Sequence, residues 1–304
     1  MDPVKALRRS SGVATRAQVL ALGVGRRRLE QAVRDNDLVR HRHGLTAPGA
    51  PAEVVAAAHW GGAVGCSSAL RLHGVPVVNP SPVHLLLRSS RSTSGVIVHR
   101  SSRAAGVEDL LPAAGRAVRC LPRHEALVVA DAVIRTGTDP EQVRDAAGPR
   151  PGSDARWVLA HADARSESPI ESLLRALVLD IGARDVALQV AVPNVGRVDL
   201  LVDGWLVLEA DGFASHGTPA GFQADWDRNS AAASLGLVTL RFTHHDLVRD
   251  PEGVTAAIRA VIARRSRTTF RLATAPSPPV RRAARPVTHR GSSGALRSFV
   301  ASAH

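Results

Sequence analysis

The chain has 304 residues and a formal net charge of +12 at pH 7, from 39 Lys and Arg against 27 Asp and Glu. No run of about 18 apolar residues predicts a membrane span, and the N-terminus lacks the apolar segment of a secretory signal. We therefore expect a cytoplasmic protein of more than one domain, with a polyanionic partner and no membrane partner.

Residues 4–47 predict three short helices followed by a hairpin, and residues 1–47 carry a net charge of +6. Thr15 and Gln18 have the spacing of a capping box, RRRLEQAVRDN predicts a basic helix, and LVRHRHGLTA predicts a basic hairpin. This order of elements is typical of a winged helix-turn-helix that contacts DNA, although a solvated basic surface is the alternative. We expect the phosphate contacts from Arg16, Arg26, Arg27, Arg28, Arg40 and Arg42.

The segment GVATRAQVLALGVGRRRLEQAVRDNDLVRHRHGLTA resembles the winged-helix module of AbiEi-type antitoxins from type IV toxin–antitoxin systems. Residues 64–136, with VGCSSALRLHGVP, resemble the second domain of those antitoxins. The resemblance implies a winged helix at 1–48 and an AbiEi-like α+β domain at 52–148. Because many proteins contain this module, the resemblance implies DNA contact more than antitoxin activity.

Residues 52–148 predict this α+β segment from helical and strand patterns but show no obvious chemistry. Cys66 and Cys120 lie far apart and outside any C-x-x-C spacing, so we expect free thiols and neither a disulfide framework nor a zinc site. Four histidines lie singly without metal-ligand spacing, and we expect structural or surface roles for His73, His84, His99 and His124.

The stretch GRVDLLVDGWLVLEADGF predicts a hairpin whose acids share one face. Its even-numbered positions hold apolar residues or glycine, whereas every charged residue is odd-numbered. A three-residue loop ending at Gly204, with this glycine in the left-handed conformation, keeps the two faces separate. Asp199 would then lie opposite Val207, with Glu209 as its diagonal neighbour.

Two half-buried carboxylates at this spacing repel each other and need compensation. Magnesium accepts one or two carboxylates together with waters and a substrate phosphate. Asp199 and Glu209 therefore predict a site for Mg²⁺ or Mn²⁺ that supports phosphodiester hydrolysis. The alternative is that the acids cap the hairpin edge and form ion pairs with Arg197, Arg228 or Arg241.

The flanking segments predict a mixed sheet with helices packed on it, at residues 166–264. One helix precedes the hairpin, and a helix, a strand with the sequence LVTLRFT, and a last helix at 251–265 follow it. A hairpin followed by a helical crossover to another strand gives such an α/β domain. Residues 266–304 are rich in Pro, Ser and Arg and predict a disordered basic tail.

Five blocks, SPIESLLR, Gln189, GRVDLLVDGWLVLEADGFASH, DWDRN and LGLVTLRFTHHDL, resemble the uncharacterised domains related to the very-short-patch-repair (Vsr) endonucleases of the PD-(D/E)XK superfamily. The resemblance covers residues 166–264 and implies a restriction-endonuclease-like fold. It implies that Asp199 and Glu209 are metal ligands, and that the catalytic residues are Glu171, Asp199, Glu209, Asp211 and His216. Supporting polar positions are matched by Gln189, Asp225, Arg228 and Arg241.

One position departs from the superfamily pattern. Where E-x-K commonly places a Lys that orients the attacking water, this chain has Asp211 in E-A-D. This branch commonly has an acid there, so the departure is not by itself a sign of lost activity. The general base stays unassigned, and His216 is its candidate.

We therefore expect a DNA-binding, divalent-metal-dependent endonuclease-like protein. Its partner would be nucleic acid, in first place duplex DNA, and it would use no nucleotide cofactor. The alternative is an antitoxin-type DNA-binding transcriptional regulator with a cognate toxin as partner and a catalytically inactive nuclease-like domain. A third possibility, an RNase or structure-selective nuclease, differs from the first in substrate alone.

Overall fold

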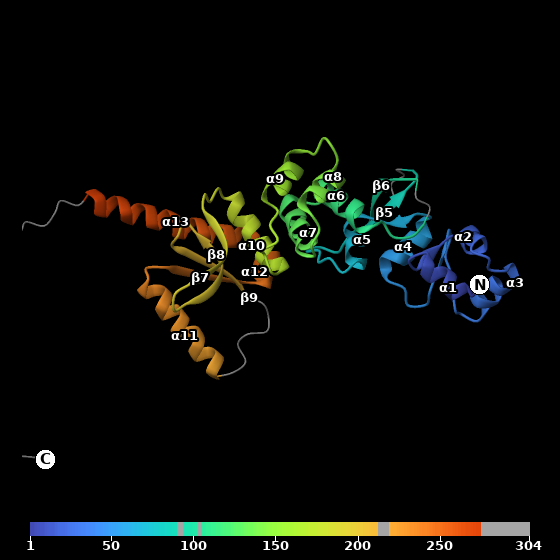
Figure 1. The fold of residues 1–304 in the computed structure, drawn as a ribbon, viewed down its shortest axis with the longest axis horizontal. Helices are drawn as coiled ribbons and strands as arrows, with labels where there is room; N and C mark the ends of the chain where they lie inside the picture. The colour runs from blue at the N-terminus through green and yellow to red at the C-terminus, as the bar shows by residue number, and fades with distance from the viewer. Residues whose placement is uncertain (90–93, 103–104, 212–218, 275–304) are drawn as a thin grey trace, which may run out of the picture. The chain divides into compact units, whose positions relative to one another are not determined.

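Helices and three small sheets make up a mixed α/β chain in the computed structural model (Figure 1). The structure describes residues 1–89, 94–102, 105–211 and 219–274, excepting the side chains of 219–222, 224–225 and 266–274. The chain divides into a compact unit, Met1–Val261, and a second unit that begins at Ile262. In the described ranges, none of the helices is long and apolar enough to cross a membrane.

The N-terminal region combines three short helices with an antiparallel sheet of order β1-β3-β2. The predicted capping box is confirmed, because the Gln18 N–H donates to Thr15 Oγ1 at 3.2 Å and the Thr15 N–H donates to Gln18 Oε1 at 2.8 Å. The elements are α1 (Pro3–Arg9), β1 (Val13–Ala14), α2 (Arg16–Ala21), α3 (Arg26–Arg34), β2 (Val39–Arg40) and β3 (Leu45–Thr46).

The middle region packs helices around a sheet in which β5 lies between antiparallel β4 and parallel β6. Helix α7 lies inside this region, since every residue from Ala126 to Ile134 is buried. The elements are α4 (Ala52–Trp60), β4 (Ala63–Val64), α5 (Cys66–Leu72), β5 (Val83–Leu87), β6 (Val96–Arg100), α6 (Leu110–Cys120), α7 (Arg123–Arg135), α8 (Pro140–Ala147) and α9 (Ser153–His161).

A buried ion pair joins α7 to the next helix, α10 (Pro169–Asp180). Arg175 Nη2 donates to both carboxylate oxygens of Asp131, at 2.8 and 2.6 Å, and Arg175 Nη1 donates to the His161 carbonyl oxygen at 2.6 Å. Because a buried charge is tolerated only with a partner and further hydrogen bonds, this network fixes α10, which carries one of the predicted catalytic acids.

The C-terminal sheet has the order β10-β9-β8-β7, with antiparallel β7–β8 and β8–β9 pairs and a parallel β9–β10 pair. The predicted helical crossover is present as α11. Helix α13 continues to Thr274, so the predicted tail boundary at 266 is wrong; the sequence has no Pro or Gly between Gly253 and Pro276 to end a helix sooner. The remaining tail, 275–304, lies outside the described residues. The elements after α10 are β7 (Val186–Val192), β8 (Gly196–Val202), β9 (Leu206–Asp211), α11 (Pro219–Ser234), β10 (Val238–Thr243), α12 (His244–Arg249) and α13 (Pro251–Thr274).

The β8–β9 hairpin keeps its even-numbered apolar residues on one face, as predicted, but in another register. Val202 pairs with Leu206, so the three-residue loop runs from Asp203 to Trp205 and does not end at Gly204. Asp203 and Gly204 both have positive φ, 50° and 70°, and the Trp205 N–H donates to the Val202 carbonyl oxygen at 3.2 Å. This hydrogen bond closes a tight turn at Asp203 and Gly204. Trp205 is the one extra residue between the turn and the paired strands, and it keeps the even-numbered side chains of both strands on the same face.

Candidate functional site

Four adjacent strands of the C-terminal sheet each place one polar residue at the same level. Arg241 on β10 pairs with Glu209 on β9. Extending the β8–β9 register by one residue places Asp199 across from Glu209, and the β7–β8 pairs on either side place Gln189 across from Asp199. We call Gln189, Asp199, Glu209 and Arg241 the polar row. The prediction that Val207 lies opposite Asp199 is therefore wrong. Asp199 and Glu209 lie directly across from each other and not diagonally, as was expected.

Glu209 is buried and is paired with two arginines. Arg228 Nη2 on α11 donates to Glu209 Oε1 at 2.9 Å, and Arg241 Nε donates to Oε2 at 2.8 Å. Arg228 also donates to two backbone carbonyl oxygens of the β7–β8 segment. Of the three predicted alternative ion-pair partners, Arg228 and Arg241 contact this acid, whereas Arg197 contacts Glu167 at 2.7 Å.

Asp199 is half-buried and accepts a hydrogen bond from a backbone group. The Ala210 N–H donates to Asp199 Oδ2 at 2.9 Å. Burial raises the pKa of Asp199 to about 6, and the negative charges of Glu171, Glu209 and Asp211 add to this effect, while the Ala210 hydrogen bond opposes it. The charges of these three carboxylates therefore add to the effect of burial on Asp199.

Glu171 brings a carboxylate to this group from the first turn of α10. The Glu171 N–H donates to Ser168 Oγ at 3.2 Å, which caps the helix. Glu171 Oε2 accepts hydrogen bonds from Gln189 Nε2 and from the Glu167 N–H, both at 2.8 Å. Gln189 has a φ of 52° within β7, which is uncommon for a residue other than Gly. The helix is thereby connected to the polar row through Gln189.

The other predicted site residues lie at or beyond the end of β9. Asp211 is the last residue of β9 and pairs in register with Thr243 on β10. His216 lies outside the described residues, so the structure does not place the predicted candidate base. Asp225 belongs to α11, but its side chain is outside what the structure describes.

The donor set of this acidic site, which we define as Glu171, Asp199, Glu209 and Asp211, consists of carboxylate oxygens. Such hard ligands suit Mg²⁺ or Mn²⁺ and do not suit softer ions that prefer nitrogen or sulfur. A bound cation would offset both the burial of the Asp199 charge, which is the main cause of its raised pKa, and the repulsion from the other acids, which adds to it. At Glu209, however, the cation would share the carboxylate with two guanidinium groups.

The predicted DNA-contacting arginines of the N-terminal region are all exposed. Arg26, Arg27 and Arg28 form the first turn of α3. A hollow of about 410 Å³ between the start of α2 and the β2–β3 turn is lined by Arg16, Arg40 and Arg42. Arg16 also forms an ion pair with Glu30 at 2.9 Å.

Four cysteines and histidines of the middle region, which lack metal-ligand spacing in the sequence, come together in the fold. Cys66, His84, His99 and Cys120 each offer one possible ligand atom, and these atoms all lie within 4.8 Å of one another. Both cysteines are free thiols, as predicted. A hydrogen bond from the Cys66 thiol lowers the pKa of Cys120, and hydrogen bonds from the two imidazoles act in the same direction against the effect of burial.

Two proteins of Mycobacterium tuberculosis are similar to this chain over most of their length. The uncharacterized protein Rv2248 of strain ATCC 25618 / H37Rv and the uncharacterized protein MT2308 of strain CDC 1551 / Oshkosh are each 30% identical to it over 261 residues, covering 77% of this chain and 95% of the relative. The chain belongs to their family. No protein-family model matches the chain, and no solved structure matches it.

The names of these family members state no activity, so the chemistry of this chain rests on its own residues. The structure brings together the predicted residues Glu171, Gln189, Asp199 and Glu209, with Arg228 and Arg241 on the same acid. Both metal-ligand candidates are included. What sequence reasoning missed is the cluster of two cysteines and two histidines, whose members are 18, 15 and 21 residues apart.

Proposed function

We propose that this protein is a DNA-binding, divalent-metal-dependent endonuclease that hydrolyses phosphodiester bonds. The observation that carries the proposal is the position of Asp199 across from Glu209 on neighbouring strands, with Glu171 joined to the same row through Gln189. A cluster of carboxylates on a sheet is costly unless a cation compensates it. The order helix, three antiparallel strands, helix and parallel strand agrees with the restriction-endonuclease-like fold that the Vsr resemblance implies.

In this proposal Asp199 and Glu209 hold Mg²⁺ or Mn²⁺, which when bound lowers the pKa of a water and neutralises charge on the phosphate. Arg228 and Arg241 fix the orientation of the Glu209 carboxylate, and Gln189 does the same for Glu171. The N-terminal winged helix supplies the affinity for DNA, since its exposed arginines can contact phosphates without reading sequence.

The test is a cleavage panel with Mg²⁺ or Mn²⁺ on plasmid, linear, mismatched and single-stranded DNA, with RNA as a separate arm. Asp199→Asn should lower cleavage by about 100-fold or more while DNA binding persists, because the variant loses a ligand charge and keeps its size. Asp203→Asn, in the exposed turn of the same hairpin, is the matched control and should cleave like the wild type. Intact substrates in every arm would reject the proposal, and cleavage of RNA alone would reassign the substrate.

A second function is favoured by the pairing of Glu209 with two arginines, which occupies both oxygens of a proposed metal ligand. In this alternative the protein is an antitoxin-type DNA-binding transcriptional regulator, and its nuclease-like domain is a scaffold or a surface for a cognate toxin. DNA binding would then be sequence-selective, would depend on Arg26, Arg27 and Arg28, and would be unchanged by Asp199→Asn, with no cleavage by the wild type.

A further inference from the structure

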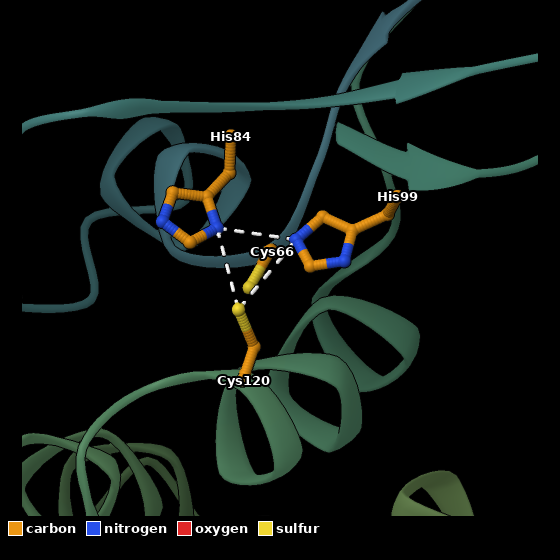
Figure 2. Close-up of side chains that lie close together, drawn as sticks. All are labelled: Cys66, His84, His99 and Cys120. Carbon is orange, nitrogen blue, oxygen red and sulfur yellow. Dashed lines mark hydrogen bonds between the residues drawn. The ribbon is translucent and has the colours of Figure 1, made fainter. Parts of the chain in front are cut away.

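The cluster of Cys66, His84, His99 and Cys120 has the composition and spacing of a metal site away from the acidic site. Figure 2 shows the four side chains turned toward one another from α5, β5, β6 and the end of α6. His84 Nδ1 lies 3.1 Å from His99 Nε2, and Cys120 Sγ lies 3.8 Å from each of these nitrogens. The ligand atoms of His84, His99 and Cys120 therefore lie together in one small volume.

These separations match the edges of a zinc tetrahedron. With Zn–N bonds of about 2.0–2.1 Å and Zn–S bonds of about 2.3 Å, tetrahedral geometry requires about 3.3 Å between two nitrogens and about 3.6 Å between nitrogen and sulfur. The observed 3.1 and 3.8 Å differ from these lengths by a few tenths of an ångström. A cation of this size fits between these three ligand atoms with only slight side-chain movement, and Cys66 offers a fourth ligand atom within 4.8 Å of each.

The backbone around Cys66 is held in a conformation that aims its thiol into the cluster. Cys66 has a φ of 52°, which residues other than Gly rarely adopt and which persists only where the surroundings support it. Its N–H donates to Glu108 Oε2 at 2.9 Å, and Arg116 in turn donates to Glu108 Oε1 at 2.9 Å. This chain of contacts uses the Cys66 backbone N–H and positions the first ligand.

The burial of the four side chains and the net charge of the site with its ion favour Zn²⁺. Cys66 and His84 are buried, and His99 and Cys120 are half-buried. Two thiolates, two neutral imidazoles and one Zn²⁺ give a net charge of zero, which a buried position tolerates. Four protein ligands with two sulfurs and two nitrogens are typical of structural zinc sites and leave no open position for catalysis.

We propose that Cys66, His84, His99 and Cys120 bind one Zn²⁺ ion that ties α5, β5, β6 and α6 together. The site is independent of the proposed nuclease function, because it involves none of the residues of the acidic site. A hollow of about 380 Å³ lined by His99 and Cys120 gives the ion a route of access.

The test measures the metal content of the full chain purified without chelator, by inductively coupled plasma mass spectrometry. We expect about one zinc per chain, and loss of nearly all of it in Cys66→Ser and in Cys120→Ser. His99→Cys, which supplies another zinc ligand, should keep the metal, whereas His99→Ala should lose it. His245→Ala, which removes an exposed histidine outside the cluster, should keep the wild-type content.

A second measurement does not depend on the folding of any variant. Wild-type protein loaded with Co²⁺ should show the intense visible absorption of a tetrahedral ion and a thiolate charge-transfer band, and excess Zn²⁺ should remove both. Wild type without bound zinc and without these bands would overturn the proposal. So would an intact mass showing a Cys66–Cys120 disulfide in the freshly purified protein, because oxidised sulfurs cannot bind the ion as thiolates.

Discussion

At the scale of single residues, the two strand acids of the polar row differ in how their charges are compensated. Glu209 faces two guanidinium groups, whereas Asp199 accepts a backbone N–H and lies among other acids. The two arginines compensate the charge of Glu209, whereas burial destabilises the ionised form of Asp199 and raises its pKa. Without a cation, Asp199 is therefore the acid that weakens the fold when it ionises.

The pH dependence of stability follows from this difference. The pKa of Asp199 rises from 3.8 to about 6 on folding, so its contribution to stability is fully present below about pH 4 and is lost as the pH rises through about 6. The groups that face Asp199 are Glu171 on α10, Glu209 and Asp211 on β9, and the Ala210 N–H.

Asp199→Asn cannot ionise, so it should gain stability relative to wild type between about pH 4 and about pH 7. After allowance for solvent screening of this half-buried group, the gain should be about 1–2 kcal/mol. Urea denaturation of both proteins in metal-free buffer measures it. If the difference in unfolding free energy between the two proteins stays constant over this pH range, Asp199 has an ordinary pKa. Added Mg²⁺ should stabilise the wild type and not the variant.

At the scale of elements, the turn of the β8–β9 hairpin fixes which acids share a face. Gly204 has a φ of 70°, and nothing lies within 4 Å of where its Cβ would be. Substitution there is consequently opposed by the backbone conformation and not by a clash. The extra residue at Trp205 then restores the pairing of even-numbered with even-numbered residues.

Gly204→Ala should lower the free energy of unfolding by about 1–2 kcal/mol, the cost of a left-handed residue with a Cβ. Gly204→Asn is the matched control and should cost less, since Asn tolerates this conformation better than other residues with side chains. Urea denaturation measures both. An alanine variant as stable as the wild type would mean that the turn adopts another conformation in solution.

Sequence periodicity predicted this hairpin well because its even-numbered residues face the core: Val198, Leu200, Leu206 and Leu208 are all buried, although Val207 and Glu209 on β9 are buried too. The alternation of even-numbered and odd-numbered residues could not fix the strand register. A three-residue loop that starts at Val202 and one that starts at Asp203 both keep the even-numbered residues on one face. The Cys and His cluster was beyond such reasoning for another reason. His84 and His99 share a face only because β5 and β6 pair in parallel, with Leu86 opposite His99, and strand pairing is a tertiary property.

At the scale of the whole chain, positive charge is concentrated at the two ends. Residues 1–47 carry a net +6 and residues 264–304 a net +9, so 48–263 carry −3. A polyanion is attracted to the ends and repelled by the acidic site until a cation is bound there. In the function we propose, nucleic acid would bind to the basic regions, and the acidic region would act on it only with a bound metal ion.

The salt dependence of DNA binding tests this division. Arg42→Ala should reduce the slope of the logarithm of the association constant against the logarithm of salt concentration by about 0.9, the value for one phosphate contact. Arg144→Ala removes the same charge from exposed helix α8, where Arg144 pairs with Glu141, and should leave the slope unchanged. Fluorescence anisotropy with duplex DNA measures both variants. A slope for Arg42→Ala equal to that of the wild type would show that Arg42 does not contact a DNA phosphate.

The left-handed backbone of Gln189 has a consequence for self-association. Strand β7 is at the end of the C-terminal sheet, whose strand order is β10-β9-β8-β7, and a regular edge strand offers a template on which a second chain can add a strand. Gln189, with its φ of 52°, interrupts the ladder between the Leu188 and Val190 pairs. The irregularity that lets Gln189 reach Glu171 also makes this edge a poor template for intermolecular strand addition.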